Sequence, residues 1–330
     1  MIEYSAPGKA VVWGEYAVLE GAPAMVMAVD RYARASIEPS ADQWHLQAKG
    51  YESSATLTAS ELRTAEASEA QGISGLVSAV INALESPALP PGARLHTDTQ
   101  AFHTVGADGT AMKLGIGSSA AICTAASAAI AEFLDQPFDE SLPLAAHRLL
   151  QGKAGSGLDV AAACHGGLIR FQSGQTSPAQ WPESWVYQYF WVGHSAKTSA
   201  HLVRFGDWRA SADTSTLDAL CQASEGLFHQ PELSRLADYV ARLKTMDQTA
   251  RLGIFSEAHD RLHALANQAQ VVYKPCGAGG GDIGIAVSDD PAQLNELISL
   301  VTQQDTQSSD DSFLTLDLEI AAHGVHRSRS

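Results

Sequence analysis

The stretch from Lys113 to Leu134, KLGIGSSAAICTAASAAIAEFL, constrains the fold more than any other part of the chain. Gly115 and Gly117 allow backbone conformations that other residues rarely adopt, and the alanine-rich run behind them favours a long helix. Ser118 and Ser119 stand at the start of that run, where serine commonly caps a helix. The unpaired N–H groups and the dipole at a helix start bind anions, and phosphate is a common occupant. The stretch therefore predicts either a phosphate-binding loop or only a tight turn with a helix cap.

Composition narrows the classes of protein to which this chain can belong. The 330 residues carry a net charge of −16, which opposes nonspecific binding to nucleic acid or to anionic lipid. No apolar run approaches the roughly 18 residues of a membrane span, and the N-terminus lacks the basic and apolar regions of a secretory signal. Four cysteines stand singly, which argues against a zinc site or a disulfide framework. We expect a cytoplasmic protein that binds neither nucleic acid nor membrane and that holds any anionic ligand with a local cluster of donors.

The patterns along the chain predict two α+β halves. β-Branched and aromatic runs broken by glycine and proline indicate strands over most of the first sixty residues, and a helix is expected over 72–85. The polar, proline-containing segment 172–184 is the expected boundary, so residues 1–180 and 181–330 are assigned to two domains. The second half is expected to hold a strand over 185–193, helices over 215–244 and 248–268, and strands over 280–288 and 313–320 on either side of a helix.

Three glycine-rich segments, distant in the sequence, combine glycine with lysine or hydroxyl groups. They are APGKAVVWGEYAVLEG from Ala6, KLGIGSSAA from Lys113 and KPCGAGGGDIGIAV from Lys274. Their order and content resemble the three signature motifs of the GHMP kinases, the family of galacto-, homoserine, mevalonate and phosphomevalonate kinases. The resemblance implies an α+β GHMP kinase fold with two domains. The N-terminal, ATP-binding domain would contain a left-handed βαβ unit, contrary to the usual hand, and the C-terminal domain would be ferredoxin-like.

The resemblance also implies that the loop before the long helix binds ATP. Lys113 precedes the glycines here, whereas the lysine of the G-x-x-x-x-G-K-[ST] loop follows them. Backbone donors and the helix dipole would cradle the phosphates by another route and leave a hydroxyl group free for Mg²⁺. The residues expected to bind ATP are Gly115, Ile116, Gly117, Ser118, Ser119 and Ala120, and Ser119 is also the expected Mg²⁺ ligand, with Glu15 or Asp159 as less favoured candidates.

Four features are similar to those of the family members that phosphorylate 5-phosphomevalonate. Lys113 stands before the second motif, Asp282 follows the last glycines directly, GKAGSGLDV presents Asp159, and HSAKTSAHLV is similar to a segment that lines the substrate site. Two departures occur, because Lys197 stands where serine is commoner and Cys276 where serine or threonine is usual. The expected reaction is ATP-dependent phosphorylation of 5-phosphomevalonate to 5-diphosphomevalonate, in the mevalonate route to isoprenoids.

Other functions stay open at this point. A mevalonate kinase is the first alternative, and another small-molecule kinase or a mevalonate-phosphate decarboxylase of the same fold is the next. A family member that binds a ligand without catalysis is disfavoured, because Lys9, Ser119 and Asp159 are all intact. These residues also have ordinary structural explanations, since lysines are usually solvated at the surface and Asp159 could simply cap a helix. The oligomeric state is expected to be a monomer or a homodimer.

The expected chemistry assigns roles to the matched residues. A phosphate nucleophile is already anionic near neutral pH, because its second pKa lies near 6, so a strong general base is unnecessary. Bringing two polyanions together instead requires cations, for which Lys9, Lys113 and Lys197 are the candidates. The catalytic residues are expected to be Lys9, Lys113 and Asp159, with Asp159 acting as a base only if the acceptor is an alcohol. The expected substrate ligands are Glu15, Tyr16, Ser156, His194, Lys197, Thr198, Ser199, Gly277, Ala278, Gly279, Gly280 and Asp282.

Overall fold

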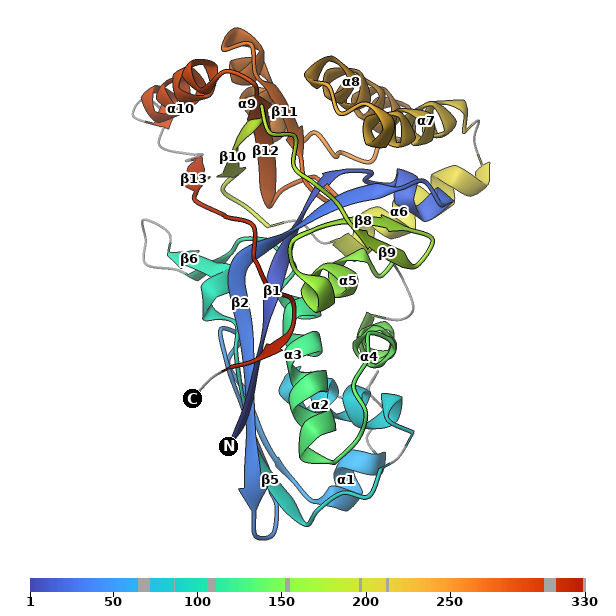
Figure 1. Cartoon of the computed structure of the whole chain (residues 1–330), viewed down its shortest axis with the longest axis vertical. Helices are drawn as coiled ribbons and strands as arrows, with labels where there is room; N and C mark the ends of the chain where they lie inside the picture. Colours follow the sequence, from blue (N-terminus) through green and yellow to red (C-terminus); the bar gives the residue numbers. More distant parts are fainter. Residues whose placement is uncertain are drawn as a thin grey trace.

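Two long antiparallel strands, β1 (Ile2–Trp13) and β2 (Ala24–Ser40), form the centre of the first half of the chain. The first six residues of β2 are buried, whereas exposed and buried residues alternate near its end. Such alternation is typical of a sheet that packs on a core with one face only. The computed structural model describes residues 1–64, 72–85, 87–105, 111–151, 155–195, 198–211, 214–305 and 313–328. Figure 1 shows β1 and β2 side by side, rising from the lower part of the molecule.

In the described residues the first sheet has eight strands, and its central path runs β14-β1-β2-β5-β3-β4, with β8 paired to β2 and β9 paired to β8. Most neighbours are antiparallel, but β3 and β5 are parallel. The chain between this parallel pair includes β4 and two helices, so it forms a crossover, and the left hand expected from the family resemblance stays a prediction. The remaining bounds are β3 (Trp44–Lys49), β4 (Ser53–Leu57), α1 (Ala59–Thr64), α2 (Gly72–Ala83), β5 (Gly92–Asp98), β8 (Leu168–Gln172), β9 (Gln175–Pro178) and β14 (His326–Arg327).

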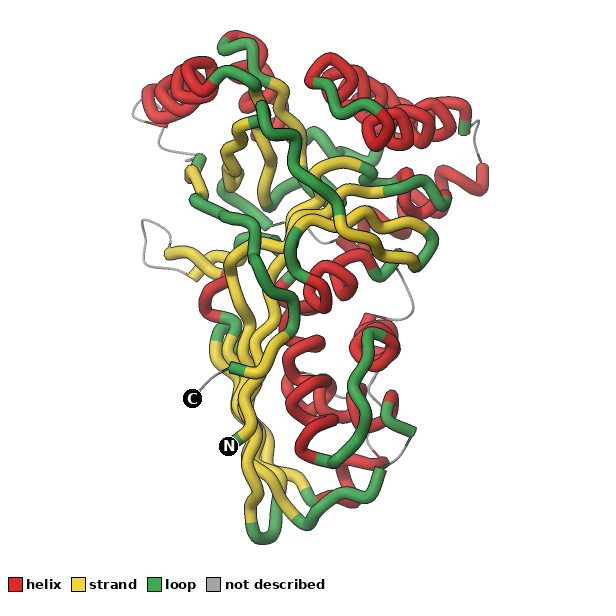
Figure 2. Tube along the Cα trace, in the orientation of Figure 1, coloured by secondary structure: helices red, strands yellow, loops and turns green. Residues whose placement is uncertain are grey.

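Helices cover one face of this sheet, as Figure 2 shows. The long helix α3 (Ser118–Phe133) is buried along most of its length, because its many alanines let it lie close to β1 and β2. Helices α4 (Ser141–Gln151) and α5 (Leu158–His165) pack against it. The predicted helices over 72–85 and behind the glycine-rich loop are therefore confirmed. Two short strands, β6 (His103–Val105) and β7 (Ala111–Lys113), lead into that loop.

The second half is built on a four-stranded antiparallel sheet in the order β11-β12-β10-β13. With helices between the first and second and between the third and fourth strands, this order is the ferredoxin-like pattern implied by the family resemblance. Its elements are β10 (Val186–Trp191), α6 (Thr198–Ser211), α7 (Ser215–His229), α8 (Leu233–Ala250), α9 (Glu257–Gln268), β11 (Val272–Pro275), β12 (Ile283–Ser288), α10 (Pro291–Asp305) and β13 (Leu314–Leu316).

The helical predictions for this half were wrong in their boundaries. Three helices occupy the region expected to hold two, and α6 was not predicted. Helix α7 ends just before Pro231, because proline in a helix interior removes a hydrogen bond and clashes with the preceding turn. Helix α8 ends where Arg251 and Gly253 adopt positive φ angles. Within the described ranges, no helix is both long and apolar enough to cross a membrane.

The end of the chain returns to the first sheet. After β13, the Ala321 amide donates a hydrogen bond to the Ala28 carbonyl, and β14 pairs with β1. Figure 1 accordingly shows the end of the described chain near the N-terminus, at the first sheet. The division of the chain after residue 180 stays a prediction, and the last residues of the second segment lie on the first half.

Candidate active site

The predicted phosphate loop joins β7 to α3. Gly115 and Gly117 have φ angles of 76° and 82°, in the left-handed region that glycine tolerates. Gly117 is the N-cap of α3, and no side chain caps this end. The expected capping role of Ser118 and Ser119 was therefore wrong, because both lie inside the first turn of the helix. Among the described residues, no side-chain cap therefore occupies the first N–H groups of α3, as an anion site requires.

All three glycine-rich motifs meet at this loop. The Lys9 amide donates a 2.8 Å hydrogen bond to the Ile116 carbonyl. The Lys9 side chain runs across Gly117, where a Cβ atom would lie 2.9 Å from Lys9 Cγ, and its Nζ would lie 3.5 Å from a Cβ on Gly277. Asp282 packs on the loop even more closely, since a Cβ on Gly115 would lie 2.0 Å from Asp282 Cγ. These glycines therefore allow side chains of the first and third motifs to cross the second.

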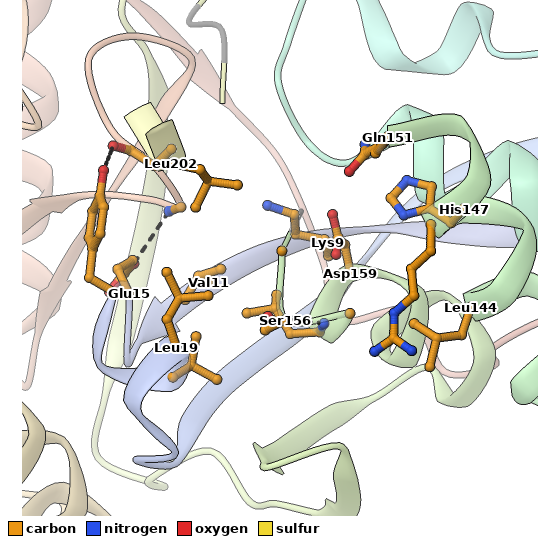
Figure 3. Close-up of a pocket in the computed structure, with 18 residues that line it drawn as sticks. Lys9, Val11, Glu15, Leu19, Leu144, His147, Gln151, Ser156, Asp159 and Leu202 are labelled. Carbon is orange, nitrogen blue, oxygen red and sulfur yellow. Dashed lines mark hydrogen bonds between the residues drawn. The ribbon is translucent and has the colours of Figure 1, made fainter. Parts of the chain in front are cut away.

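A pocket opens beside the loop, between the two halves of the chain. Figure 3 shows Lys9 of β1 beside Asp159 of α5, with His147 and Gln151 of α4 across from them. Apolar side chains from β1, the following turn and α6 form another part of the wall. The lining residues include Lys9, Val11, Glu15, Tyr16, Leu19, Leu144, His147, Arg148, Gln151, Ser156, Asp159, Leu202, Gly277 and Ala278.

Lys9 and Asp159 are half-buried in this pocket. Within the described ranges, neither the Lys9 ammonium nor the Asp159 carboxylate has a hydrogen-bond or ion-pair partner. The N-cap of α5 is Gly157 without a side-chain cap, so Asp159 does not serve as a helix cap. Among the described residues, both charges are therefore available to a ligand.

Helix α4 adds polar groups that the sequence analysis did not identify. His147 is 5% exposed, and its Nε2 has no hydrogen-bond partner in the described structure. Burial lowers the pKa of His147, although the nearby Asp159 carboxylate opposes this shift. Leu144, Arg148 and Gln151 line the pocket from the same helix. Their spacing of i, i+4 and i+7 was the signal that could have identified this face.

A second pocket lies at the phosphate loop. Lys113, Ser118 and Ser119 line it, and Gln151 belongs to both pockets. The described lining of the first pocket does not include Lys113, so Lys113 does not share that pocket with Lys9 and Asp159. The other residues of this second pocket are Tyr51, Gly72, Leu76, Thr99, His103, Ile122 and Leu150.

Glu15 reaches the pocket lining but is held by other protein groups. Its carboxylate accepts hydrogen bonds from Lys274 Nζ, from the Tyr239 hydroxyl at 2.8 Å and from the Gly277 amide at 3.4 Å. Lys274 and Glu15 are 1% and 3% exposed, so the pair is fully buried. Lys274 also donates to the Val11 carbonyl, and Tyr239 accepts from the Gly14 amide. This network ties the first motif to the third and leaves Glu15 little capacity to bind a substrate.

The third glycine-rich loop is held in place from several sides. The Tyr16 hydroxyl donates a 2.6 Å hydrogen bond to the Ala278 carbonyl, and burial raises the pKa of Tyr16. His194 Nε2 lies 2.8 Å from the Gly280 carbonyl, and the Asp282 amide donates to the His194 carbonyl. Gly279 packs on Ile254. Tyr16, His194 and the loop glycines thus lie together, as expected for one binding surface.

Three predicted ligands in the next segment have no described side chain. Lys197 lies outside the described residues, and Thr198 and Ser199 form the start of α6 with side chains that are not described. Their roles stay predictions. The other departure from the family pattern, Cys276, is buried beside the Glu15–Lys274 pair, and burial raises the pKa of its thiol to about 11.

Comparisons with known proteins agree with this arrangement. The family description "GHMP kinases N terminal domain" matches residues 75–167, which contain the phosphate loop. The phosphomevalonate kinase of Streptomyces sp. (strain CL190) is 30% identical over 372 aligned positions, covering 91% of this chain and 92% of that protein.

Solved structures share the fold at lower identity. A Lin0012 protein from Listeria innocua has a TM-score of 0.80 at 20% identity, covering 100% of this chain and 99% of that one. Streptococcus pneumoniae phosphomevalonate kinase in complex with phosphomevalonate and AMPPNP has a TM-score of 0.72 at 20% identity, covering 97% and 100%. The Methanococcus jannaschii mevalonate kinase has a TM-score of 0.71 at 18% identity, covering 96% and 98%. With three matched motifs meeting at one loop and a relative at 30% identity along nearly the whole chain, the protein belongs to the GHMP kinase family.

Proposed function

We propose that this protein transfers the γ-phosphoryl group of ATP to the phosphate of 5-phosphomevalonate, forming 5-diphosphomevalonate and ADP. The observation that carries the proposal is a pair of charges, Lys9 and Asp159, which have no partner among the described residues and line a pocket beside the start of α3. The 30% identical relative is a phosphomevalonate kinase, and a structure of the same fold holds phosphomevalonate and a nucleotide analogue together.

The two pockets suggest where the two substrates bind. The pocket lined by Lys113, Ser118 and Ser119 suits the nucleotide, and the pocket lined by Lys9 and Asp159 suits the acceptor. Gln151 lines both, so the two pockets adjoin at this residue. Transfer forms a bond from an acceptor phosphate oxygen to the γ-phosphorus and breaks the bond from that phosphorus to the β,γ-bridging oxygen, which leaves with ADP.

The protein groups supply positioning and charge compensation. The α3 amides and Lys9 offset negative charge on the transferring group, which is most of what phosphoryl transfer requires. Asp159 positions the neighbouring Lys9 cation. It need not remove a proton, because the acceptor phosphate is largely ionised at neutral pH. The exposed Ser119 in the first turn of α3 would be the protein ligand for Mg²⁺. Mg²⁺ takes few protein ligands and, when bound, would neutralise charge on the phosphate oxygens.

A coupled assay of ADP release tests this function. Mevalonate, 5-phosphomevalonate, 5-diphosphomevalonate, homoserine and galactose are offered separately with ATP and Mg²⁺. We expect the highest kcat/KM for 5-phosphomevalonate. Faster turnover of mevalonate would refute the proposal and make Asp159 the general base of a mevalonate kinase, since an alcohol must lose its proton. A cytoplasmic location and a monomeric or homodimeric state remain predictions.

A further inference from the structure

One face of α4 forms a wall of the acceptor pocket. Leu144, His147, Arg148 and Gln151 all line it, and their spacing places them on a single stripe of the helix. The opposite face of the helix carries Leu142 and Ala146, which are buried in the interior. The polar stripe is therefore turned towards the ligand space by the way the helix packs.

Arg148 is the permanently charged residue of this stripe, and the proposed reaction gives it no role. Its guanidinium has no hydrogen bond, ion pair or ring contact with any residue in the described ranges. Several other arginines of the chain do have carboxylate partners, such as Arg209 with Glu20 and Arg242 with Asp238. A guanidinium presents a planar pair of donors that matches a carboxylate or a phosphate, so an unpaired one in a pocket suits an anionic ligand.

The helix geometry indicates which end of the pocket Arg148 serves. Side chains on a helix lean towards its N-terminus, so Arg148 leans over the turn of Leu144 and away from Gln151. Leu144 lies against the turn before α5, because its Cδ1 would be 2.7 Å from a Cβ on Gly157. Gln151 marks the other end, where the acceptor pocket meets the nucleotide pocket. Arg148 therefore serves the end of the pocket that is remote from the reacting phosphates.

The proposed acceptor has an anionic group at each end. Its phosphate must approach Lys9, Asp159 and the start of α3, so its carboxylate must point away from them. Between these ends the pocket offers apolar side chains, including Val11 and Leu19, which suit the methyl-bearing carbon chain. On the basis of the proposed function, we propose that Arg148 binds the acceptor carboxylate and thereby selects hydroxy-acid phosphates over phosphorylated alcohols that lack a carboxylate.

The test compares two acceptors with matched variants. One acceptor is 5-phosphomevalonate, and the other carries a primary alcohol in place of its carboxylate. Arg148→Met keeps most of the apolar stem, Arg148→Lys keeps the charge, and Arg242→Met on α8 is the control for loss of a helix-surface arginine. Arg148→Met is expected to lower kcat/KM for 5-phosphomevalonate by about 30-fold, mainly through KM, as loss of a charge-assisted hydrogen bond predicts.

The same variant is expected to change kcat/KM for the alcohol analogue by less than about threefold, and Arg148→Lys to recover part of the loss. Equal losses with both acceptors would assign Arg148 a packing role and overturn the proposal, as would wild-type kinetics of Arg148→Met. If the wild-type enzyme prefers mevalonate, the proposed function fails. Mevalonate and its uncharged triol then test Arg148 in the same way.

Discussion

His259 gives the protein a sensitivity to acid that can be worked out from its contacts. The imidazole is fully buried between Tyr273, whose hydroxyl is 2.7 Å from Nδ1, and the Gly281 carbonyl, 2.9 Å from Nε2. A carbonyl can only accept, so Nε2 carries the proton and the Tyr273 hydroxyl donates to Nδ1. The neutral ring is therefore satisfied on both sides, and protonation places a second N–H against a hydroxyl group in a buried site.

Burial lowers the pKa of His259 from 6.5 to about 4. Between these values the unfolded chain binds a proton that the folded protein does not, so stability falls as the pH falls from about 6.5 to about 4. Each pKa unit corresponds to about 1.4 kcal/mol, so the loss is about 2 kcal/mol at pH 5 and about 3 kcal/mol below pH 4.

Urea unfolding of the wild type and of His259→Gln between pH 7.5 and pH 5 measures how much unfolding free energy the protein loses through His259. Glutamine keeps a donor for the Gly281 carbonyl but does not titrate. The wild type is expected to lose about 2 kcal/mol more than the variant across this range. His147 and His263, whose pKa values burial also lowers, remain in both proteins and cancel in the comparison. Replacing the exposed His96 by Gln is the control.

Parallel stability curves for the wild type and His259→Gln would refute the reasoning. A steeper loss of stability in His259→Gln than in the wild type would show that His259 affects the pH dependence with the opposite sign to the one expected. If the His96→Gln control flattened the curve as much as His259→Gln, the effect would belong to the general charge balance of the protein and not to the buried ring.

The remaining predictions concern the charges around the loop. Asp159→Asn is expected to lower kcat strongly while the Kd of a nucleotide analogue changes little, and equal losses in both would place Asp159 at the nucleotide. Lys113→Met is expected to raise the KM for ATP about tenfold and to leave the acceptor KM nearly unchanged, because Lys113 lines the second pocket; the reverse pattern would restore its expected contact with the acceptor. Lys274→Met strands the buried Glu15 charge and is expected to lower the unfolding free energy by about 3–5 kcal/mol, against less than about 1 kcal/mol for the more exposed Lys244→Met. Similar values for these two lysine variants in urea would contradict the buried pair.

Local patterns in the sequence predicted local structure well. The glycines and the alanine-rich run fixed the start of α3, because positive φ angles and helix propensity depend on a few neighbouring residues. The predicted helix boundaries in 215–268 were wrong because the helical pattern of apolar residues continues through the break at Pro231 and the turn at Gly253. Assignment of capping to the serines failed because Gly117 could take the left-handed cap position one residue earlier.

The candidate site was predicted only where a motif carried it. Lys9 and Asp159 lie in matched segments and share the pocket, whereas His147 and Arg148 lie in an ordinary amphipathic helix and were missed. Nothing local in the sequence says which face of α4 meets a cavity, because that depends on how the helix packs against the rest of the chain. The stripe of polar residues at helical spacing becomes informative only once the pocket is known.

The contrast between Lys9 and Lys274 explains why motif membership alone does not assign a role. Both lysines belong to glycine-rich motifs, yet Lys274 is buried against Glu15 and Lys9 is left without a partner in the described structure. The attraction within the Glu15–Lys274 pair offsets the cost of removing both charges from water, so this pair can hold two loops together but has no capacity left for a ligand. Lys9 and Arg148 keep that capacity. In a protein with a net charge of −16, whose long-range field repels anions, such short-range unpaired cations are what a polyanionic substrate requires.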